Sequence, residues 1–167
     1  YLLYNYQQKA SFEAEEMHDW NSAKLYSEKA LKAIDGEKIY PEKITYWKIP
    51  KNKIREIRIG YDNLISIYED AILKDPKNLA KAISSLDCWA EQEEEKWQTW
   101  DIDSCKNTFV TAMHEMYNNL QEETVKTKEE ISKKTEDNNQ VSIVTQNTNK
   151  ELMQIIYFDF DDFKLSE

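Results

Sequence analysis

Helical periodicity runs through most of this sequence. Apolar side chains return at every third or fourth position in three stretches: Leu3, Tyr6, Ala10, Ala14 and Met17; Ala23, Tyr26, Ala30 and Ala33; and Ile54, Ile57, Tyr61, Leu64, Tyr68 and Ala71. This spacing places the apolar residues on one face of an α-helix. Only two glycines and three prolines occur in 167 residues, which disfavours a turn-rich β-sandwich or a disordered chain. The sequence therefore predicts an all-α domain.

Local signals divide the first 50 residues into a helical hairpin and a loop. Asp19 or Asn21 can cap a second helix that stops at Gly36, so residues 2–35 are expected to form an antiparallel hairpin. Residues 37–50 contain two prolines and no helical period, which predicts a connecting loop. Three aromatic residues of this loop are expected to fold onto the surface of the core: Tyr40, Tyr46 and Trp47.

Three more helices are expected to follow. The first begins near Pro50 and ends at Asp75, the second spans residues 78–96, and Asp101 or Asp103 caps the third. Their inward-facing residues include Leu79, Ile83, Leu86 and Ala90, then Ile102, Cys105, Phe109, Met113, Met116 and Leu120.

Gly60 lies in the middle of the first of these helices. A glycine there costs about 1 kcal/mol relative to alanine, so it indicates a close helix crossing or a kink.

The composition changes after Leu120. Residues 121–150 are charged and polar, which predicts a helical extension followed by a linker. Residues 151–167 begin an alternating apolar pattern that indicates a β-strand. Because one strand cannot stand alone, we expect it to open a second domain that this sequence truncates. The predicted division is thus a helical domain at 1–120, an extension at 121–150 and a strand at 151–167.

The overall charge limits the partners. A net charge of −10 disfavours nucleic acid and anionic membrane surfaces, and no stretch of 18 apolar residues could span a bilayer.

The segment 86–105 concentrates unusual residues, because it holds both cysteines, three of the five tryptophans and the densest acidic run. One interpretation is a surface that binds a partner. The alternative is that the tryptophans pack in the core and the acids form a solvated helix face. The candidate partner surface comprises Trp89, Glu91, Glu94, Glu95, Trp97 and Trp100.

The residues do not settle the state of Cys88 and Cys105. They could form a disulfide in an oxidising compartment or remain two thiols in a reducing one. Bridging requires Cα atoms within about 7 Å. The expected helix ends place Cys88 about 12 Å from the end of its helix and Cys105 about 6 Å into the next. To bring the two level, the connecting loop would have to run back along the first helix, or that helix would have to end early.

No pattern indicates catalysis, a metal or a cofactor. His18 and His114 have no serine or cysteine at a catalytic spacing, and the two cysteines lack the two further ligands that zinc requires. Two groups of closely spaced aspartates lack the glycine and the terminal glutamate of a calcium-binding loop: Asp101 and Asp103, and Asp159, Asp161 and Asp162. A cell-wall hydrolase using paired carboxylates would need an acid pair in a cleft, which no motif indicates. We therefore expect a protein that is not an enzyme, with no catalytic residue.

The first hairpin resembles part of a tetratricopeptide repeat. The later half of that repeat is matched by Asp19, Trp20, Ala23, Tyr26, Ala30 and Leu31. A weaker match occurs at Ala71-Ile72 and Asp75-Pro76, 41 residues further along, and Ser11 stands where the repeat has glycine. The resemblance implies a tetratricopeptide-like arrangement of antiparallel hairpins, not an array of repeats.

The end of the chain resembles the opening strand of OmpA-like peptidoglycan-binding domains, through residues 157–161 and Leu165-Ser166. Residues 12–20, 86–95 and 101–105 are similar to the helical N-terminal region of alphaproteobacterial OmpA-family envelope proteins.

This resemblance implies a periplasmic, outer-membrane-associated module with a structural or protein-interaction role. It implies that Cys88 and Cys105 form a disulfide, that an upstream lipid is the only membrane anchor, and that peptidoglycan is bound only by the missing domain. The partner protein is not specified. The alternative is a cytoplasmic tetratricopeptide-like adaptor, which would have free thiols.

Overall fold

The structure is a computed structural model that describes residues 1–96 and 99–136, with side chains up to residue 121. It contains five α-helices in this range: α1 (Leu2–Phe12), α2 (Trp20–Ile34), α3 (Ile54–Lys74), α4 (Pro76–Glu95) and α5 (Thr99–Glu136). A π-helical turn, η1 (Glu13–Met17), follows α1, and a 3₁₀ turn, η2 (Ile44–Tyr46), interrupts the loop before α3. The described residues contain no strand, so the all-α prediction is confirmed for them. The strand predicted within 151–167 lies outside the described residues.

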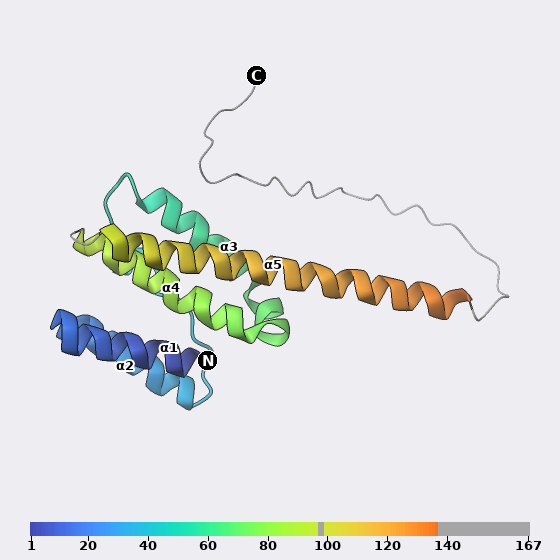
Figure 1. Cartoon of the computed structure of the whole chain (residues 1–167), viewed down its shortest axis with the longest axis horizontal. Coiled ribbons are helices and arrows are strands. Elements are labelled where there is room, and N and C mark those ends of the chain that lie inside the picture. Colours follow the sequence, from blue (N-terminus) through green and yellow to red (C-terminus); the bar gives the residue numbers. More distant parts are fainter. Residues whose placement is uncertain (97–98, 137–167) are drawn as a thin grey trace, which may run out of the picture.

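Helix α4 occupies the centre of the molecule. The α1–α2 hairpin lies along one side of it, and α3 and α5 cover the other (Figure 1). Because α4 has neighbours on opposite sides, 15 of its 20 residues are buried. Helix α5 continues beyond the other helices to Glu136 (Figure 1). None of the described helices is long and apolar enough to cross a bilayer.

Two of the predicted helix boundaries are confirmed by their hydrogen bonds or backbone angles. The Asp19 carboxylate accepts bonds from the backbone N–H groups of Asn21 (2.8 Å) and Ser22 (3.2 Å), which caps α2. Gly36, two residues after α2, adopts the left-handed conformation with φ of 76° that glycine tolerates best.

A single residue, Asp75, joins α3 to α4. Its backbone N–H closes α3 on the carbonyl of Ala71 at 2.8 Å, and its carboxylate caps α4 on the N–H of Asn78 at 3.1 Å. Asn119 of α5 donates to the same carboxylate at 2.6 Å. Burial raises the pKa of Asp75, but the bonds its carboxylate accepts from the Asn78 side chain (2.9 Å), from Asn119 and from the Asn78 N–H outweigh burial and lower the pKa. The tight cap explains why α4 begins at Pro76 and not at the predicted residue 78.

The prediction that α3 begins at Pro50 is wrong, since the helix begins at Ile54. The Pro50 carbonyl instead closes a turn by accepting bonds from the N–H groups of Lys53 (2.9 Å) and Ile54 (3.0 Å).

The loop before α3 is packed against the core through some of its aromatic residues. Trp47 is buried, and the ring of Tyr40 stacks on that of Tyr68 with centroids 4.5 Å apart. Tyr46 is exposed, but its ring lies edge-on against the buried Trp47 with centroids 4.8 Å apart, so it covers the surface of the core as predicted.

Gly60 marks a close helix crossing, one of the two predicted alternatives. A Cβ atom at this position would lie 2.9 Å from Cε1 of Phe109 on α5 and 3.7 Å from the Trp89 ring on α4. Since Phe109 is buried and its ring packs against that of Trp89, it has little room to move away.

We expect Gly60→Ala to destabilise the protein by about 1 kcal/mol, because overpacking outweighs the gain in helix propensity. In a Phe109→Leu background the same substitution should become neutral or stabilising, since the opposing ring edge is gone. Urea unfolding of the four proteins in this double-mutant cycle measures both values. A stabilising Gly60→Ala in the wild-type background would show that the crossing is looser than described.

Candidate functional site

The predicted partner surface is not a single surface. Trp89 is fully buried and Glu91 is only 2% exposed, so neither can contact a partner directly. The prediction failed because it gave α4 one solvated face, whereas the α1–α2 hairpin covers that face. The other residues are placed as follows: Glu94 and Glu95 are half-buried, Trp100 is exposed, and Trp97 lies outside the described residues.

Cys88 of α4 and Cys105 of α5 lie at disulfide distance, with Cα atoms 5.7 Å apart. The two cysteines were expected at different distances from the connecting loop. This difference disappears because α4 ends at Glu95 and α5 already begins at Thr99. Cys88 is then seven residues from its helix end and Cys105 six residues into the next, or about 10 and 9 Å. The pair fastens the two antiparallel helices near their shared end.

A buried ion pair joins the hairpin to α4. The Lys29 ammonium of α2 donates to the Asp87 carboxylate of α4 at 2.6 Å, and the Tyr6 hydroxyl of α1 donates to the same oxygen at 2.6 Å. The second Asp87 oxygen accepts the backbone N–H of Glu42 at 2.6 Å. Lys29 also donates to the Tyr40 carbonyl at 3.0 Å and pairs with Glu42 at 3.0 Å. One buried cation and one buried anion therefore hold four segments together.

A second polar cluster lies one helical turn along α4, at Glu91. Its carboxylate accepts a 2.5 Å hydrogen bond from the Tyr26 hydroxyl of α2, while its other oxygen has no hydrogen-bond partner among the described residues. Burial raises the pKa of Glu91 to about 7, although bonds from Ser22 and Tyr26 oppose the shift. Burial and the adjacent carboxylate also raise the pKa of Tyr26, which keeps its hydroxyl a donor.

Glu13, the first residue of the π-helical turn, belongs to this second cluster. It is 3% exposed, and one of its carboxylate oxygens has no hydrogen-bond partner in the described part of the chain. Burial first, then the charges of Glu91 and Glu95, raise the pKa of Glu13 to about 8. Lys9 is the nearby cation that opposes the shift. At neutral pH the cluster therefore favours a protonated carboxyl beside a charged one.

The sequence carried a weak signal for these buried groups. Lys29 lies between Tyr26 and Ala30 on the apolar stripe of α2, and Glu13 lies three residues after Ala10 on that of α1. A charged residue inside an apolar stripe indicates a buried partner, but it does not identify that partner.

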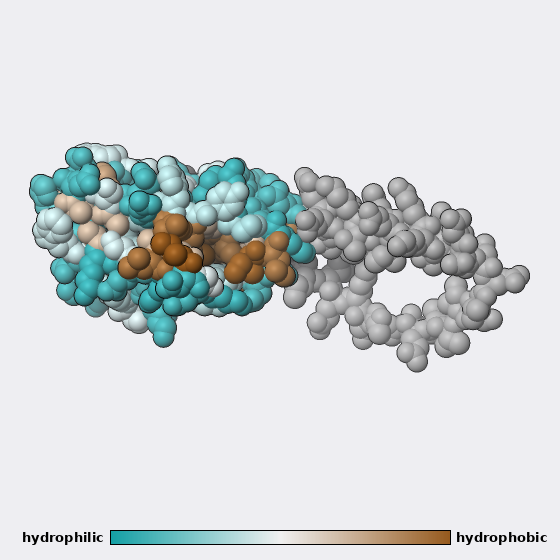
Figure 2. All heavy atoms as spheres, turned by 90° about the horizontal axis from the view of Figure 1, so that it is seen from below, coloured by the Kyte–Doolittle hydropathy of each residue, from teal (hydrophilic) through white to brown (hydrophobic). Residues whose placement is uncertain are grey.

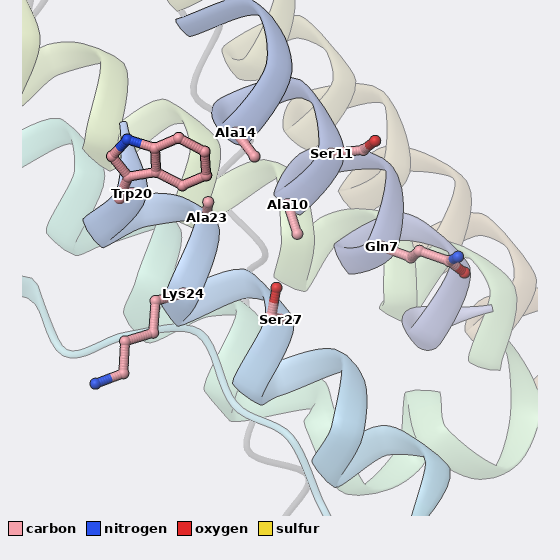
Figure 3. A pocket seen from close by; sticks show the side chains of 8 residues that line it. All are labelled: Gln7, Ala10, Ser11, Ala14, Trp20, Ala23, Lys24 and Ser27. Carbon is pink, nitrogen blue, oxygen red and sulfur yellow. The ribbon is translucent and has the colours of Figure 1, made fainter. Parts of the chain in front are cut away.

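The outer face of the hairpin carries a groove. It has a volume of about 470 Å³ and lies between α1 and α2, on the face turned away from α4 (Figure 3). Small side chains form its floor and Trp20, 70% exposed, stands at one end. Figure 3 shows all of its lining residues: Gln7, Ala10, Ser11, Ala14, Trp20, Ala23, Lys24 and Ser27.

Apolar side chains extend this surface beyond the groove. Leu31 and Ile34 are each 61% exposed and follow Trp20, Lys24 and Ser27 along one side of α2. Figure 2, which views the hairpin side of the molecule, shows apolar residues gathered on this face. A hairpin with an exposed apolar groove can accept another helix, since small residues allow close backbone approach.

The described residues contain no group of three histidine, cysteine, aspartate or glutamate side chains placed to hold a metal ion. The carboxylates with raised pKa values face the hairpin–α4 interface and line neither this groove nor a second hollow, which lies between the loop before α3 and α3 itself. Comparisons with protein-family models, curated proteins and solved structures found no match to this chain.

We expect Lys29→Met to destabilise the protein by about 3–5 kcal/mol, because it leaves the Asp87 carboxylate buried without its cation. Adding Asp87→Asn should recover at least about 1 kcal/mol, since the amide oxygen can accept the Glu42 N–H and the amide NH₂ can donate to the Tyr6 hydroxyl, without a buried charge. Chemical denaturation measures both effects. Lys38→Met, which breaks the exposed pair with Glu69, is the control and should cost at most about 1 kcal/mol. If the double variant were less stable than Lys29→Met, the buried Lys29–Asp87 ion pair would be contradicted.

We expect stability to fall as the pH rises from about 5 to about 8. Glu13 and Glu91 have folded pKa values of about 8 and about 7, above the ordinary value of 4.5, so the folded state binds more protons across this range. Glu13→Gln keeps the shape of the protonated group and should stabilise the protein by about 2 kcal/mol at pH 8.5 but little at pH 5. Urea unfolding at several pH values measures this.

Glu15→Gln is the matched control, because Glu15 is exposed two residues away. It should leave the pH dependence unchanged. A wild-type stability that rises between pH 5 and 8 would refute the buried protonated carboxyl.

Proposed function

We propose that this chain is a non-enzymatic helical module of a bacterial cell-envelope protein, with a structural or protein-interaction role at the periplasmic face of the outer membrane. The observation that carries the proposal is the Cys88–Cys105 pair at disulfide distance. Structural disulfides persist in oxidising compartments such as the periplasm and are rare in the cytosol. By the chain-entropy relation, closing a loop of 17 residues contributes about 3 kcal/mol.

The finer assignment is a tetratricopeptide-like module that leads into an OmpA-like domain. The antiparallel α1–α2 hairpin supports the first part, because Asp19 caps its second helix where the repeat motif has its acidic-aromatic turn. The OmpA-like part rests on the sequence of residues 157–166. Peptidoglycan would then be bound by the following domain, and a lipid attached upstream would hold the module at the membrane.

The shape of the chain supports a spacer role. Helix α5 contains 38 residues and is therefore about 57 Å long, of which the bundle covers only the first part (Figure 1). The Cys88–Cys105 pair, at disulfide distance, places the first turns of α5 beside α4.

The interaction role is assigned to the groove between α1 and α2. Its small-residue floor and its exposed Trp20, Leu31 and Ile34 suit the apolar face of an amphipathic helix from a protein partner. The same groove would serve the alternative function, a cytoplasmic tetratricopeptide-like adaptor. The two functions differ in the state of the cysteines.

The deciding experiment counts thiols in the full-length protein from its native cells. Cells are lysed in an alkylating reagent, and the intact mass is measured without reductant. We expect no alkylated cysteine among positions 88 and 105, and recovery of the protein with the envelope fraction. Two alkylated cysteines in a soluble fraction would support the cytoplasmic adaptor.

A Cys88→Ser variant is the matched control, since it must show one alkylated cysteine at position 105 in the same assay. Without that signal, a missing alkylation would reflect poor access and not a disulfide.

A further inference from the structure

The exposed face of α2 carries a row of side chains with the spacing of a coiled-coil seam. Trp20 is 70% exposed at the start of the helix, and Leu31 and Ile34 are each 61% exposed near its end. Lys24 and Ser27, which are also exposed, lie between them. Successive members of this row are four, three, four and three positions apart, which is the heptad spacing that keeps side chains on one face. No helix in the described part of the chain covers this face.

The side chains of this seam are large at its ends and small at its centre. Ser27 lies at the middle, and it lines the groove together with Ala10 and Ser11 of the neighbouring α1 (Figure 3). Small residues at the middle of a helical face allow the backbone of a second helix to approach closely. The large residues at the two ends then contact that helix on either side of the close approach.

A second copy of the same seam matches this pattern when it runs antiparallel. After a two-fold rotation, Trp20 of each copy can lie opposite Leu31 of the other, so that one tryptophan stands at each end of the contact. The same register places Lys24 opposite Ser27 of the other copy, and the small residues therefore meet at the centre. The seam is thus its own complement, which an unrelated helix would have to reproduce.

The charges beside the seam also match in this register. Within one copy Lys24 and Glu28 are 3.8 Å apart, and their side chains are 76% and 54% exposed. In the antiparallel pair, Lys24 of one copy is offset by about 1.5 Å along the helix axis from Glu28 of the other. The two lysines are offset by about 4.5 Å and the two glutamates by about 7.5 Å, so opposite charges are the nearest neighbours. Lys24 is the one charged residue that lines the groove.

We propose that the groove between α1 and α2 binds a second copy of this chain, so that two hairpins pack face to face as an antiparallel two-fold dimer. The inference rests on the interaction role proposed above for this groove, and it names the partner.

The size of the hairpin face determines how tight such a dimer can be. Helix α2 contains 15 residues and is about 22 Å long, and two packed helices are about 20 Å wide. Each copy therefore offers about 400 Å² in projection, which is at the low end for specific interfaces. The dimer is accordingly weak and reversible, with a Kd of about 10–100 µM.

The test measures the mass of the full chain in solution by sedimentation equilibrium, up to a concentration of about 1 mM. We expect a reversible equilibrium between monomer and dimer. Trp20→Ala should weaken dimerisation at least about tenfold, because a tryptophan buried in a small interface is a hot spot. Ser27→Arg should weaken it by a similar factor of about ten, since a long side chain at the centre holds the two helices apart.

Two charge reversals test the antiparallel register. Lys24→Glu and Glu28→Lys should each weaken dimerisation about fivefold, because each replaces two attractive contacts between the copies with two repulsive ones. An equimolar mixture of the two variants should recover the wild-type affinity, since both contacts of the mixed dimer again join opposite charges. An effect within one copy cannot produce this recovery, because each variant alone lacks the pair within its own helix.

Trp100→Ala and Ser104→Arg are the matched controls. Both residues are exposed on α5 and lie outside the lining of the groove, so these variants should dimerise like the wild type. Unfolding midpoints check that every variant is folded. Trp20 and Ser27 are exposed, so their variants should match the wild type in this measurement.

A chain that stays monomeric up to about 1 mM would overturn the inference, and the groove would then belong to a helix of another protein. A dimer that tolerates both Trp20→Ala and Ser27→Arg, or that Trp100→Ala weakens equally, would place the contact elsewhere and overturn it too. So would a mixture of charge-reversed variants that shows no recovery.

The thiol assay separates this inference from the proposed function. A monomeric chain whose two cysteines resist alkylation would overturn the dimer and leave the envelope module standing. A dimer with two free thiols would support the dimer and count against the envelope module.

Discussion

The ion pair between Lys29 and Asp87 is the interaction on which the arrangement of the helices depends. Both groups are almost fully excluded from water. Burying either charge without its partner would cost several kcal/mol of stability. They are tolerated because every neighbouring segment supplies a partner: Tyr6 from α1, Glu42 and the Tyr40 carbonyl from the loop. The pair fixes not only the distance between α2 and α4 but also the path of the loop that follows the hairpin.

The hairpin is therefore attached to α4 in a different way from α3 and α5. On the α5 side, α4 is fastened by apolar packing around Trp89 and Phe109 and by the Cys88–Cys105 pair. On the hairpin side it presents Asp87 and Glu91, two carboxylates one turn apart, to tyrosine hydroxyls and a lysine. Such contacts specify one register, since a shifted hairpin would leave buried charges unpaired. The hollow between the loop and α3 depends on this register, because the loop supplies most of its walls and α3 the rest.

Much of the fold could be predicted because it depends on local patterns. Apolar periodicity indicated the five helices. Asp19 and Gly36 indicated the start and the end of α2, and Gly60 indicated a close crossing of helices. The starts of α3 and α4 could not be placed as well, since the Pro50 turn and the Asp75 cap compete with the periodic signal.

The functional surfaces were harder to predict, because they depend on contacts between distant residues. Glu91 belongs to an acidic run that looks solvated in the sequence, and its burial follows only from Tyr26, 65 positions away. Asp87 likewise needs Lys29, 58 positions away. Neither of the two hollows includes a residue of the predicted partner surface other than those already placed elsewhere, apart from none of its glutamates.

Native-state hydrogen exchange of the α2 amides tests most directly whether buried polar contacts hold the hairpin to the rest of the molecule. If they do, the amides of Tyr26 to Ala30 should exchange only through global unfolding, with the same opening free energy as those of Ser84 to Cys88 in α4. Exchange of the α2 amides through a separate opening several kcal/mol below the global value would show that the hairpin detaches on its own, and would contradict the account.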